Sequence, residues 1–123
     1  MRRVGVILAV PLLLGLAAAG EKPRQFANLR FVVLKDYNGK PVRNASVVLH
    51  RVDGRGHQGQ GGLELKTDDE GKASYAGIPY GKLRIQVIAP GFQTYGQDQD
   101  INQPEYEFVI KLKQPQEQHS IYK

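Results

Sequence analysis

The sequence predicts an all-β protein, and within that class a seven-stranded antiparallel β-sandwich. The first indication is a set of short segments in which apolar and polar residues alternate, most clearly Lys82 to Ala89. The second is that glycine, proline, asparagine and aspartate separate these segments at intervals of roughly 8–12 residues. The third is that no segment beyond residue 20 has apolar residues at a helical period. A small closed β-barrel is the alternative, because strand number alone does not separate the two architectures.

Residues 1–20 have the three parts of a secretory signal peptide. Met1-Arg2-Arg3 is basic, Val4 to Leu16 is apolar and uncharged, and Ala17 to Gly20 consists of small residues. Cleavage after residue 19 or 20 would give an exported protein, periplasmic or extracellular, with no stable membrane insertion. An uncleaved anchor is the alternative, but the apolar run is shorter than the ~20 residues that a membrane-spanning helix needs. General secretory and twin-arginine export both remain open.

The rest of the chain has the length of one domain, which we place at residues 21–113, followed by a flexible tail at 114–123. The formal net charge of +5 falls to +3 once Arg2 and Arg3 are removed, and the basic residues are scattered, so no nucleic-acid partner is expected. The chain contains no cysteine. Disulfides, thiol catalysis and zinc–thiolate sites are therefore excluded, and stability must come from packing of the sheets.

Seven strands are predicted, each bounded by residues that favour turns. In chain order they are Asn28 to Lys35, Ala45 to Val52, Leu63 to Thr67, Lys72 to Tyr75, Lys82 to Ala89, Gln93 to Gln97 and Tyr106 to Leu112. The fifth strand should bury Leu83, Ile85, Val87 and Ala89, and the last should bury Tyr106, Phe108, Ile110 and Leu112. The sixth is polar, as expected of an edge strand.

Three connections carry the clearest turn chemistry. Asn38-Gly39 is a strong turn signal, and Asp68 to Gly71 combines side chains that bond their own backbone with a glycine free to take positive φ. Gly77 to Gly81 is expected to turn around Pro79. The segment 53–62 holds five glycines and almost nothing apolar, so we expect a mobile loop there.

Two segments resemble a known family. Asp36 to Leu49 reads Asp-x-x-Gly-Lys-Pro-Val-x-Asn-Ala-x-Val-x-Leu, and Thr67 to Phe92 contains Thr-Asp-x-x-Gly-Lys-Ala-x-Tyr, Ile-Pro-x-Gly and Ala-Pro-Gly-Phe. In this order and spacing the motifs resemble the carboxypeptidase regulatory-like domain. The resemblance implies a seven-stranded transthyretin-like sandwich, of the kind that often serves as an accessory module. This chain is similar to a free-standing exported copy, as bacteria commonly encode.

No residue pattern indicates catalysis, a metal or a cofactor. His50, His57 and His119 share no metal-ligand spacing. The chain lacks the closing Tyr-Arg-Gly-Ser of the hydrolases that resemble it in fold. Collagen-adhesin B-type repeats join a first-strand lysine to a last-strand asparagine, but no asparagine lies in 106–113, so Lys35 is expected to be a solvated strand end. The acidic run Asp68 to Glu70 is interpreted as a turn rather than a calcium loop.

Four aromatic residues in or beside turns are the candidate ligand-binding residues: Tyr37, Tyr80, Phe92 and Tyr95. Aromatic side chains on loops of a rigid sandwich can stack on sugar rings or on peptide segments. The alternative is that Phe92 and Tyr95 close the end of the core, which is the favoured interpretation for Phe92.

These observations predict a non-enzymatic, secreted or periplasmic binding or accessory module whose ligand is a protein or a carbohydrate. The alternative is a structural or assembly protein of the cell envelope that acts by edge-strand addition. The polar segment Gln93 to Gln99 and the tail residues 120–122 motivate this alternative. Oligomeric state stays open.

Overall fold

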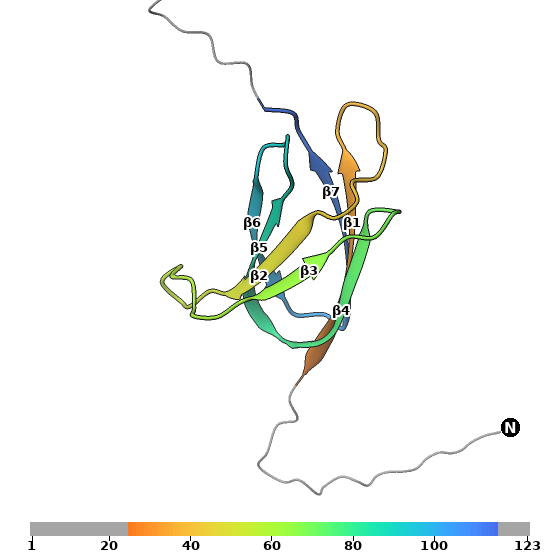
Figure 1. Ribbon diagram of the computed structural model, residues 1–123. Helices are drawn as coiled ribbons and strands as arrows, with labels where there is room; N and C mark the ends of the chain where they lie inside the picture. The colour runs from red at the N-terminus through yellow and green to blue at the C-terminus, as the bar shows by residue number, and fades with distance from the viewer. Residues whose placement is uncertain (1–24, 116–123) are drawn as a thin grey trace, which may run out of the picture.

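The computed structural model describes residues 25–115, which form two β-sheets packed face to face (Figure 1). The seven strands are β1 (Phe26–Lys35), β2 (Ser46–Arg51), β3 (Leu63–Lys66), β4 (Lys72–Pro79), β5 (Gly81–Ile88), β6 (Tyr95–Ile101) and β7 (Glu105–Leu112). One sheet has the order β4-β1-β7 and the other the order β3-β2-β5-β6. The predicted seven-stranded sandwich is therefore confirmed, and the described strands do not close into a barrel.

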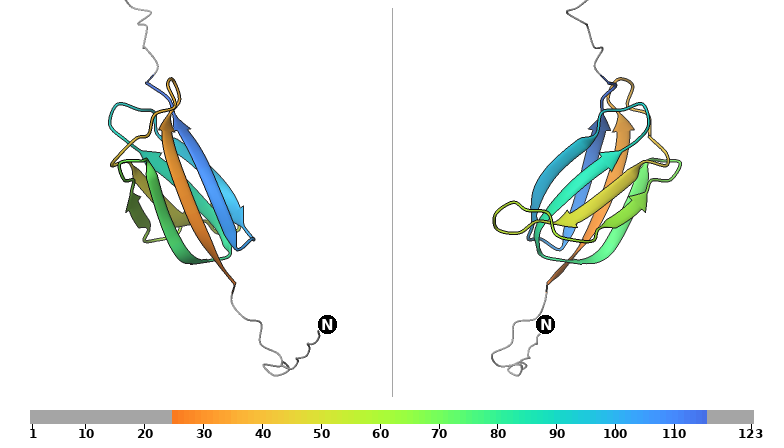
Figure 2. Two further views of the ribbon diagram at one scale, coloured as in Figure 1. Left: turned by 90° about the vertical axis from the view of Figure 1, so that its right-hand side faces the viewer. Right: turned by 60° about the vertical axis from the view of Figure 1, so that its left-hand side comes forward.

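Every strand pair is antiparallel except one. β1 and β7 run parallel, with eight residue pairs in unbroken register from Asn28 opposite Glu105 to Lys35 opposite Leu112. β1 lies at the centre of its sheet and is also paired with β4, where the register shifts between Ala27 and Asn28. The first and last strands of the described chain are thus immediate neighbours that point the same way (Figure 2).

The core is built from alternate residues of the strands, as a period of two requires. β1 contributes Ala27, Leu29, Phe31 and Val33, and all four side chains are fully buried. The predicted inward faces of β5 and β7 are also confirmed, because Leu83, Ile85, Val87, Ala89, Ile110 and Leu112 are buried and Tyr106 and Phe108 pack against them.

Two predicted strands, β4 and β6, have an end that lies more than two residues from the observed one. β4 continues past Tyr75 to Pro79, through the segment expected to turn. Gly77 has φ +83° and lies beside the register shift in β1, so the strand irregularity is absorbed without ending the strand. β6 begins at Tyr95 rather than Gln93 and reaches Ile101, because the Gln93 N–H bonds the Lys113 carbonyl oxygen (2.8 Å) instead of joining the β5 ladder.

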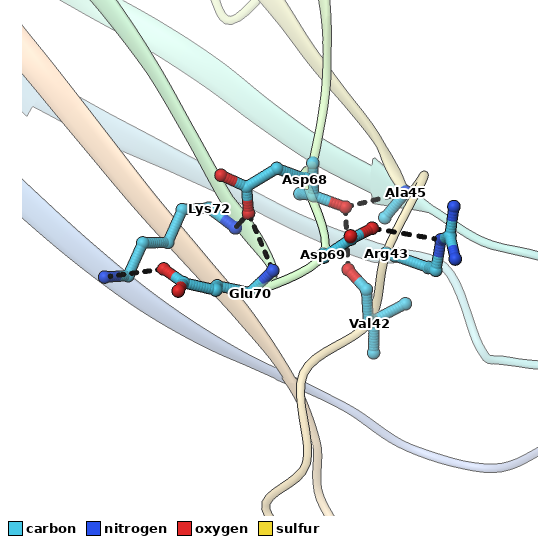
Figure 3. A network of polar contacts seen from close by, with 8 residues as sticks. Val42, Arg43, Ala45, Asp68, Asp69, Glu70 and Lys72 are labelled. Atoms are coloured by element: carbon cyan, nitrogen blue, oxygen red, sulfur yellow. Dashed lines mark hydrogen bonds and ion pairs between the residues drawn. The ribbon is translucent and has the colours of Figure 1, made fainter.

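The β3–β4 turn is bonded to the connection between β1 and β2, where the chain passes from one sheet to the other. Figure 3 shows the network, with Val42, Arg43 and Ala45 on one segment and residues Asp68 to Lys72 on the other. Asp68 Oδ1 accepts hydrogen bonds from the backbone N–H of Glu70 and of Lys72, both at 2.9 Å. These bonds lower the pKa of Asp68 below its usual value, that from Lys72 most. The acidic run is a turn, as expected from its sequence.

The predicted signal peptide, residues 1–20, lies outside the described residues, as do residues 116–123 of the predicted tail. Within residues 25–115 no helix is long and apolar enough to cross a membrane.

Candidate functional site

The four predicted aromatic residues do not form one platform. Tyr37 lies in the turn after β1 with 56% of its surface exposed. Tyr80 joins β4 to β5 at the other end of the sandwich, where its N–H bonds the carbonyl oxygen of Gln25 (3.1 Å). Phe92 and Tyr95 lie in and just after the connection from β5 to β6. Ligand binding by any of the four stays a prediction.

Three of these four side chains pack against the hydrophobic core. Tyr80, Phe92 and Tyr95 are only partly buried, and each contacts the cluster of buried core residues. This is the arrangement expected if Phe92 and Tyr95 close the core, and it extends to Tyr80. Only Tyr37 combines an exposed ring with no place in the core cluster.

The candidate site that the structure indicates instead consists of two edge strands and the connection between them. We call it the β6–β7 flank: β6 (Tyr95–Ile101), β7 (Glu105–Leu112) and the connection 102–104. β6 ends the four-stranded sheet and β7 ends the three-stranded sheet. Among residues 25–115 each strand therefore has a paired neighbour on one side only. Along the other side, backbone N–H and C=O groups are available for pairing with an added strand.

A tyrosine fixes the connection within the β6–β7 flank. The Tyr106 hydroxyl accepts a hydrogen bond from the N–H of Asn102 (2.8 Å). It also lies 2.9 Å from Asn102 Oδ1 and 3.2 Å from the Asp100 carbonyl oxygen, to either of which it can donate. The Tyr106 ring stacks on Phe108 (centroids 5.5 Å apart), which in turn stacks on Phe31 of β1 (5.4 Å). Aromatic packing therefore holds the flank to the core.

An ion pair holds β6 to β5 on the outer face of the four-stranded sheet. Arg84 Nε and a terminal guanidinium nitrogen donate to the two carboxylate oxygens of Asp98, at 2.8 and 3.0 Å. Arg84 also donates to the Gly56 carbonyl oxygen (3.2 Å), so the glycine-rich loop is bonded to the same residue. The hydrogen bond to Arg84 lowers the pKa of Asp98 and raises that of Arg84. A fork geometry of this kind fixes the position of β6 better than a single contact would.

The outer edge of β6 is continuous and, apart from the charges of Asp98 and Asp100, lacks the usual protections of edge strands. Its pairing with β5 runs over seven residues without a register shift, from Tyr95 to Ile101. Its sequence, Tyr-Gly-Gln-Asp-Gln-Asp-Ile, contains neither lysine nor proline. By contrast, β3 has four residues and ends in Lys66, and β4 contains Gly77 and ends in Pro79. Lysine, proline, bulges and short length all discourage pairing with another chain.

His50, His57 and Lys35 lie on separate segments of the described chain. His50 lies on β2 opposite Arg84, and its Nδ1 is buried without a hydrogen-bond partner. His57 Nδ1 is 3.7 Å from Asp53 Oδ2 on the exposed loop, and His119 lies outside the described residues. Lys35 ends β1 opposite Leu112. Within residues 25–115 no three histidine, aspartate or glutamate side chains converge as a metal site would require.

No family model matches the chain, and no curated protein matches it. Solved structures do match it. A streptococcal ancillary pilin aligns with a TM-score of 0.62 at 15% identity over 75% of this chain and 30% of the pilin. A 3-chlorocatechol 1,2-dioxygenase from Rhodococcus opacus 1CP aligns at 0.60 and 10% identity over 78% of this chain and 62% of the enzyme. A minor pilin of Streptococcus agalactiae aligns at 0.55 and 17% identity over 81% and 49%.

These likenesses show a shared β-sandwich fold. Sequence identities this low carry no activity from one protein to another. The chain spans less than two thirds of the length of each of these three structures.

Proposed function

We propose that this chain is an exported, non-enzymatic module of the cell envelope that binds a protein partner by strand addition at β6. The observation that carries the proposal is the seven-residue outer edge of β6, which pairs with β5 without a register shift on its inner side, is polar and contains neither lysine nor proline. An extended peptide segment that adds to such an edge gains main-chain hydrogen bonds with the ladder. Of the two functions expected from the sequence, the proposal favours assembly through an edge strand.

The placement of the aromatic residues supports a protein partner over a carbohydrate. Sugar recognition by stacking needs exposed rings, and Tyr80, Phe92 and Tyr95 are packed against the core. Tyr37 is the one candidate with a largely exposed ring, and it lies apart from Tyr80. Carbohydrate binding through Tyr37 is the competing outcome of the experiments below.

The pilin likeness supports an envelope role, since two of the three structures described above are pilins. We also propose that the chain is related to carboxypeptidase regulatory-like domains. The motifs behind that resemblance lie in turns of the structure. Gly39 and Gly71 have positive φ, and the Asp68 carboxylate accepts a hydrogen bond from the backbone N–H of Glu70 in the same turn. Export by a cleaved signal peptide would be checked by N-terminal sequencing of the protein from the envelope fraction, with residue 20 or 21 expected first.

Matched proline substitutions at Gly96 and Gln97 test strand addition. In an antiparallel pair, successive N–H groups point alternately to the neighbouring strand and to the open side. One of these two prolines therefore removes a bond to β5 and lowers stability, and the other removes only an outward donor. Thermal unfolding distinguishes the two variants, because the variant with the lower melting temperature is the one that has lost a bond to β5.

The full chain is first used as bait to capture a protein from the envelope fraction. The captured protein is identified and purified, and its dissociation constant is then measured for the parent and for each proline variant. The outward proline should weaken its binding about tenfold, the loss of roughly 1.4 kcal/mol, because one ladder bond cannot form. Equal dissociation constants for the outward-proline variant and the parent would contradict the proposal. Loss of binding in Tyr37→Ala alone would favour the stacking alternative, and substrate turnover that disappears on replacement of His50 would contradict a non-enzymatic role.

A further inference from the structure

The parallel pairing of β1 with β7 has a mechanical consequence. These are the first and last strands of the described chain, and they share eight residue pairs in unbroken register. Because they run parallel, the chain enters β1 at one end of the sandwich and leaves β7 at the opposite end (Figures 1 and 2). Tension applied to the two ends of the domain therefore acts along these strands in opposite directions.

The direction of the force decides how the hydrogen bonds break. Parallel strands carry evenly spaced bonds along their whole length. When two strands are pulled past each other, all of these bonds share the force and must fail together. When the strands are pulled apart from one end, the bonds fail one after another, each under the full force. The β1–β7 geometry is of the first kind.

We propose that the β1–β7 pair is a shear clamp, which lets the domain resist tension applied along these two strands from opposite ends. This inference goes beyond the proposed function and does not depend on it, because it rests on the pairing of β1 and β7 and makes no use of the outer edge of β6.

Side chains reinforce the clamp on both faces of the sheet. On the inner face Phe31 stacks on Phe108, its register partner, with ring centroids 5.4 Å apart. On the outer face one carboxylate bridges the strands: Glu105 accepts from Arg30 (3.0 Å) and from Asn28 (2.9 Å). Sliding one strand past the other by even one residue would separate all of these contacts.

Backbone bonds outside the ladder extend the clamp at both ends. The Asn28 N–H donates to the carbonyl oxygen of Pro104, the residue just before β7 (2.8 Å). The Asp36 N–H donates to the Leu112 carbonyl oxygen (2.9 Å) where β1 ends. The bonding thus includes one residue before β7 at one end of the pair and one residue after β1 at the other end.

Single-molecule pulling in two geometries tests the proposal. The chain has no cysteine, so pairs of introduced cysteines give unique attachment points. Gln25→Cys with Gln114→Cys loads β1 and β7 from opposite ends. Gln25→Cys with Gln103→Cys attaches both handles at the end where β1 begins, so β1 is peeled from its neighbours. All three glutamines are exposed, so the substitutions leave the core untouched.

At equal pulling speed the opposite-end pair should unfold at a severalfold higher force than the same-end pair. The unfolding force depends on the barrier to unfolding along the direction of pulling. Equal denaturant midpoints for the two variants are the control, because they show that the two variants have the same equilibrium stability. Release of about 3.6 Å of chain per residue between the attachment points identifies the event as unfolding of this domain. Equal forces in the two geometries, or a lower force for the opposite-end pair, would overturn the clamp. Loss of β6 binding in the proline variants would leave it standing.

Discussion

The Thr67 hydroxyl donates a hydrogen bond to the carbonyl oxygen of Val42 at 2.7 Å, across the passage between the two sheets. The Thr67 hydroxyl oxygen also accepts a hydrogen bond from the N–H of Ala45 at 2.8 Å, and Thr67 is almost fully buried, with 5% of its surface exposed. Thr67 follows β3, and Val42 and Ala45 precede β2. One buried hydroxyl therefore satisfies two backbone groups of a connection that has no ladder of its own.

Thr67→Val should destabilise the domain by about 1–3 kcal/mol for each of the two buried backbone groups that it leaves unpaired. Valine keeps the shape of threonine, so the change isolates the hydroxyl. Urea unfolding measures the loss, with Thr67→Ser as the control that retains the hydroxyl. If the valine variant is as stable as the parent while the serine variant is not, the methyl group rather than the hydrogen bonds matters at this position.

Gly71 and Gly39 form a matched pair of glycines in the left-handed region, with φ +76° and +74°. A side-chain carbon at Gly71 would overlap the carbonyl oxygen of Val33, whereas one at Gly39 meets open space. Gly39→Ala should therefore cost only backbone strain, on the order of 1 kcal/mol, and Gly71→Ala should cost more because β1 must also shift. Denaturant midpoints of the two variants give the comparison; equal losses would mean that the contact with Val33 relaxes freely.

The ion pair between Arg84 and Asp98 predicts a loss of stability in acid. The hydrogen bond from Arg84 lowers the pKa of Asp98 in the folded protein below the usual 3.8. A carboxylate with a lowered pKa contributes stability that is complete above its unfolded pKa and is lost as pH falls through the folded one. Asp98→Asn should therefore flatten the decline in unfolding free energy below about pH 4. The pKa of Asp68 is also lowered in the folded protein, so part of the decline in unfolding free energy should persist in Asp98→Asn.

Tyr37 and Tyr80 should respond differently to truncation. Tyr37→Ala removes an exposed ring and should change the unfolding free energy by less than about 0.5 kcal/mol. Tyr80→Ala removes a ring packed against the core and should cost about 1–3 kcal/mol. Thermal melts of the two variants distinguish them. Unchanged stability in Tyr80→Ala would restore this residue as a free ligand-binding aromatic.

The sequence was informative wherever structure is decided locally. Alternation in residues 82–89 and 106–112 identified the buried faces of β5 and β7, and Asp68 with Gly71 identified a turn, because these signals act over a few residues. Pro79 was misleading, since proline is tolerated at the end of an edge strand as well as in a turn.

The missed features depend on contacts between distant parts of the chain. The parallel partners Phe31 and Phe108 are far apart in sequence, and no local pattern reports the direction of their pairing. Burial of Tyr80 and Tyr95 was also out of reach, because an aromatic residue beside a turn can face either the core or solvent. The edge position of β6 was predicted from its polar sequence and is confirmed, but its pairing with β5 became definite only from the sheet order.

Hydrogen–deuterium exchange on the complex with the captured partner tests the central claim most directly. Strand addition would bond the outward N–H groups of β6, so amides within residues 96–100 should exchange more slowly in the complex than in the free protein. Protection confined to the turn around Tyr37 or to the loop at 53–62, with β6 exchanging at its free rate, would contradict the account.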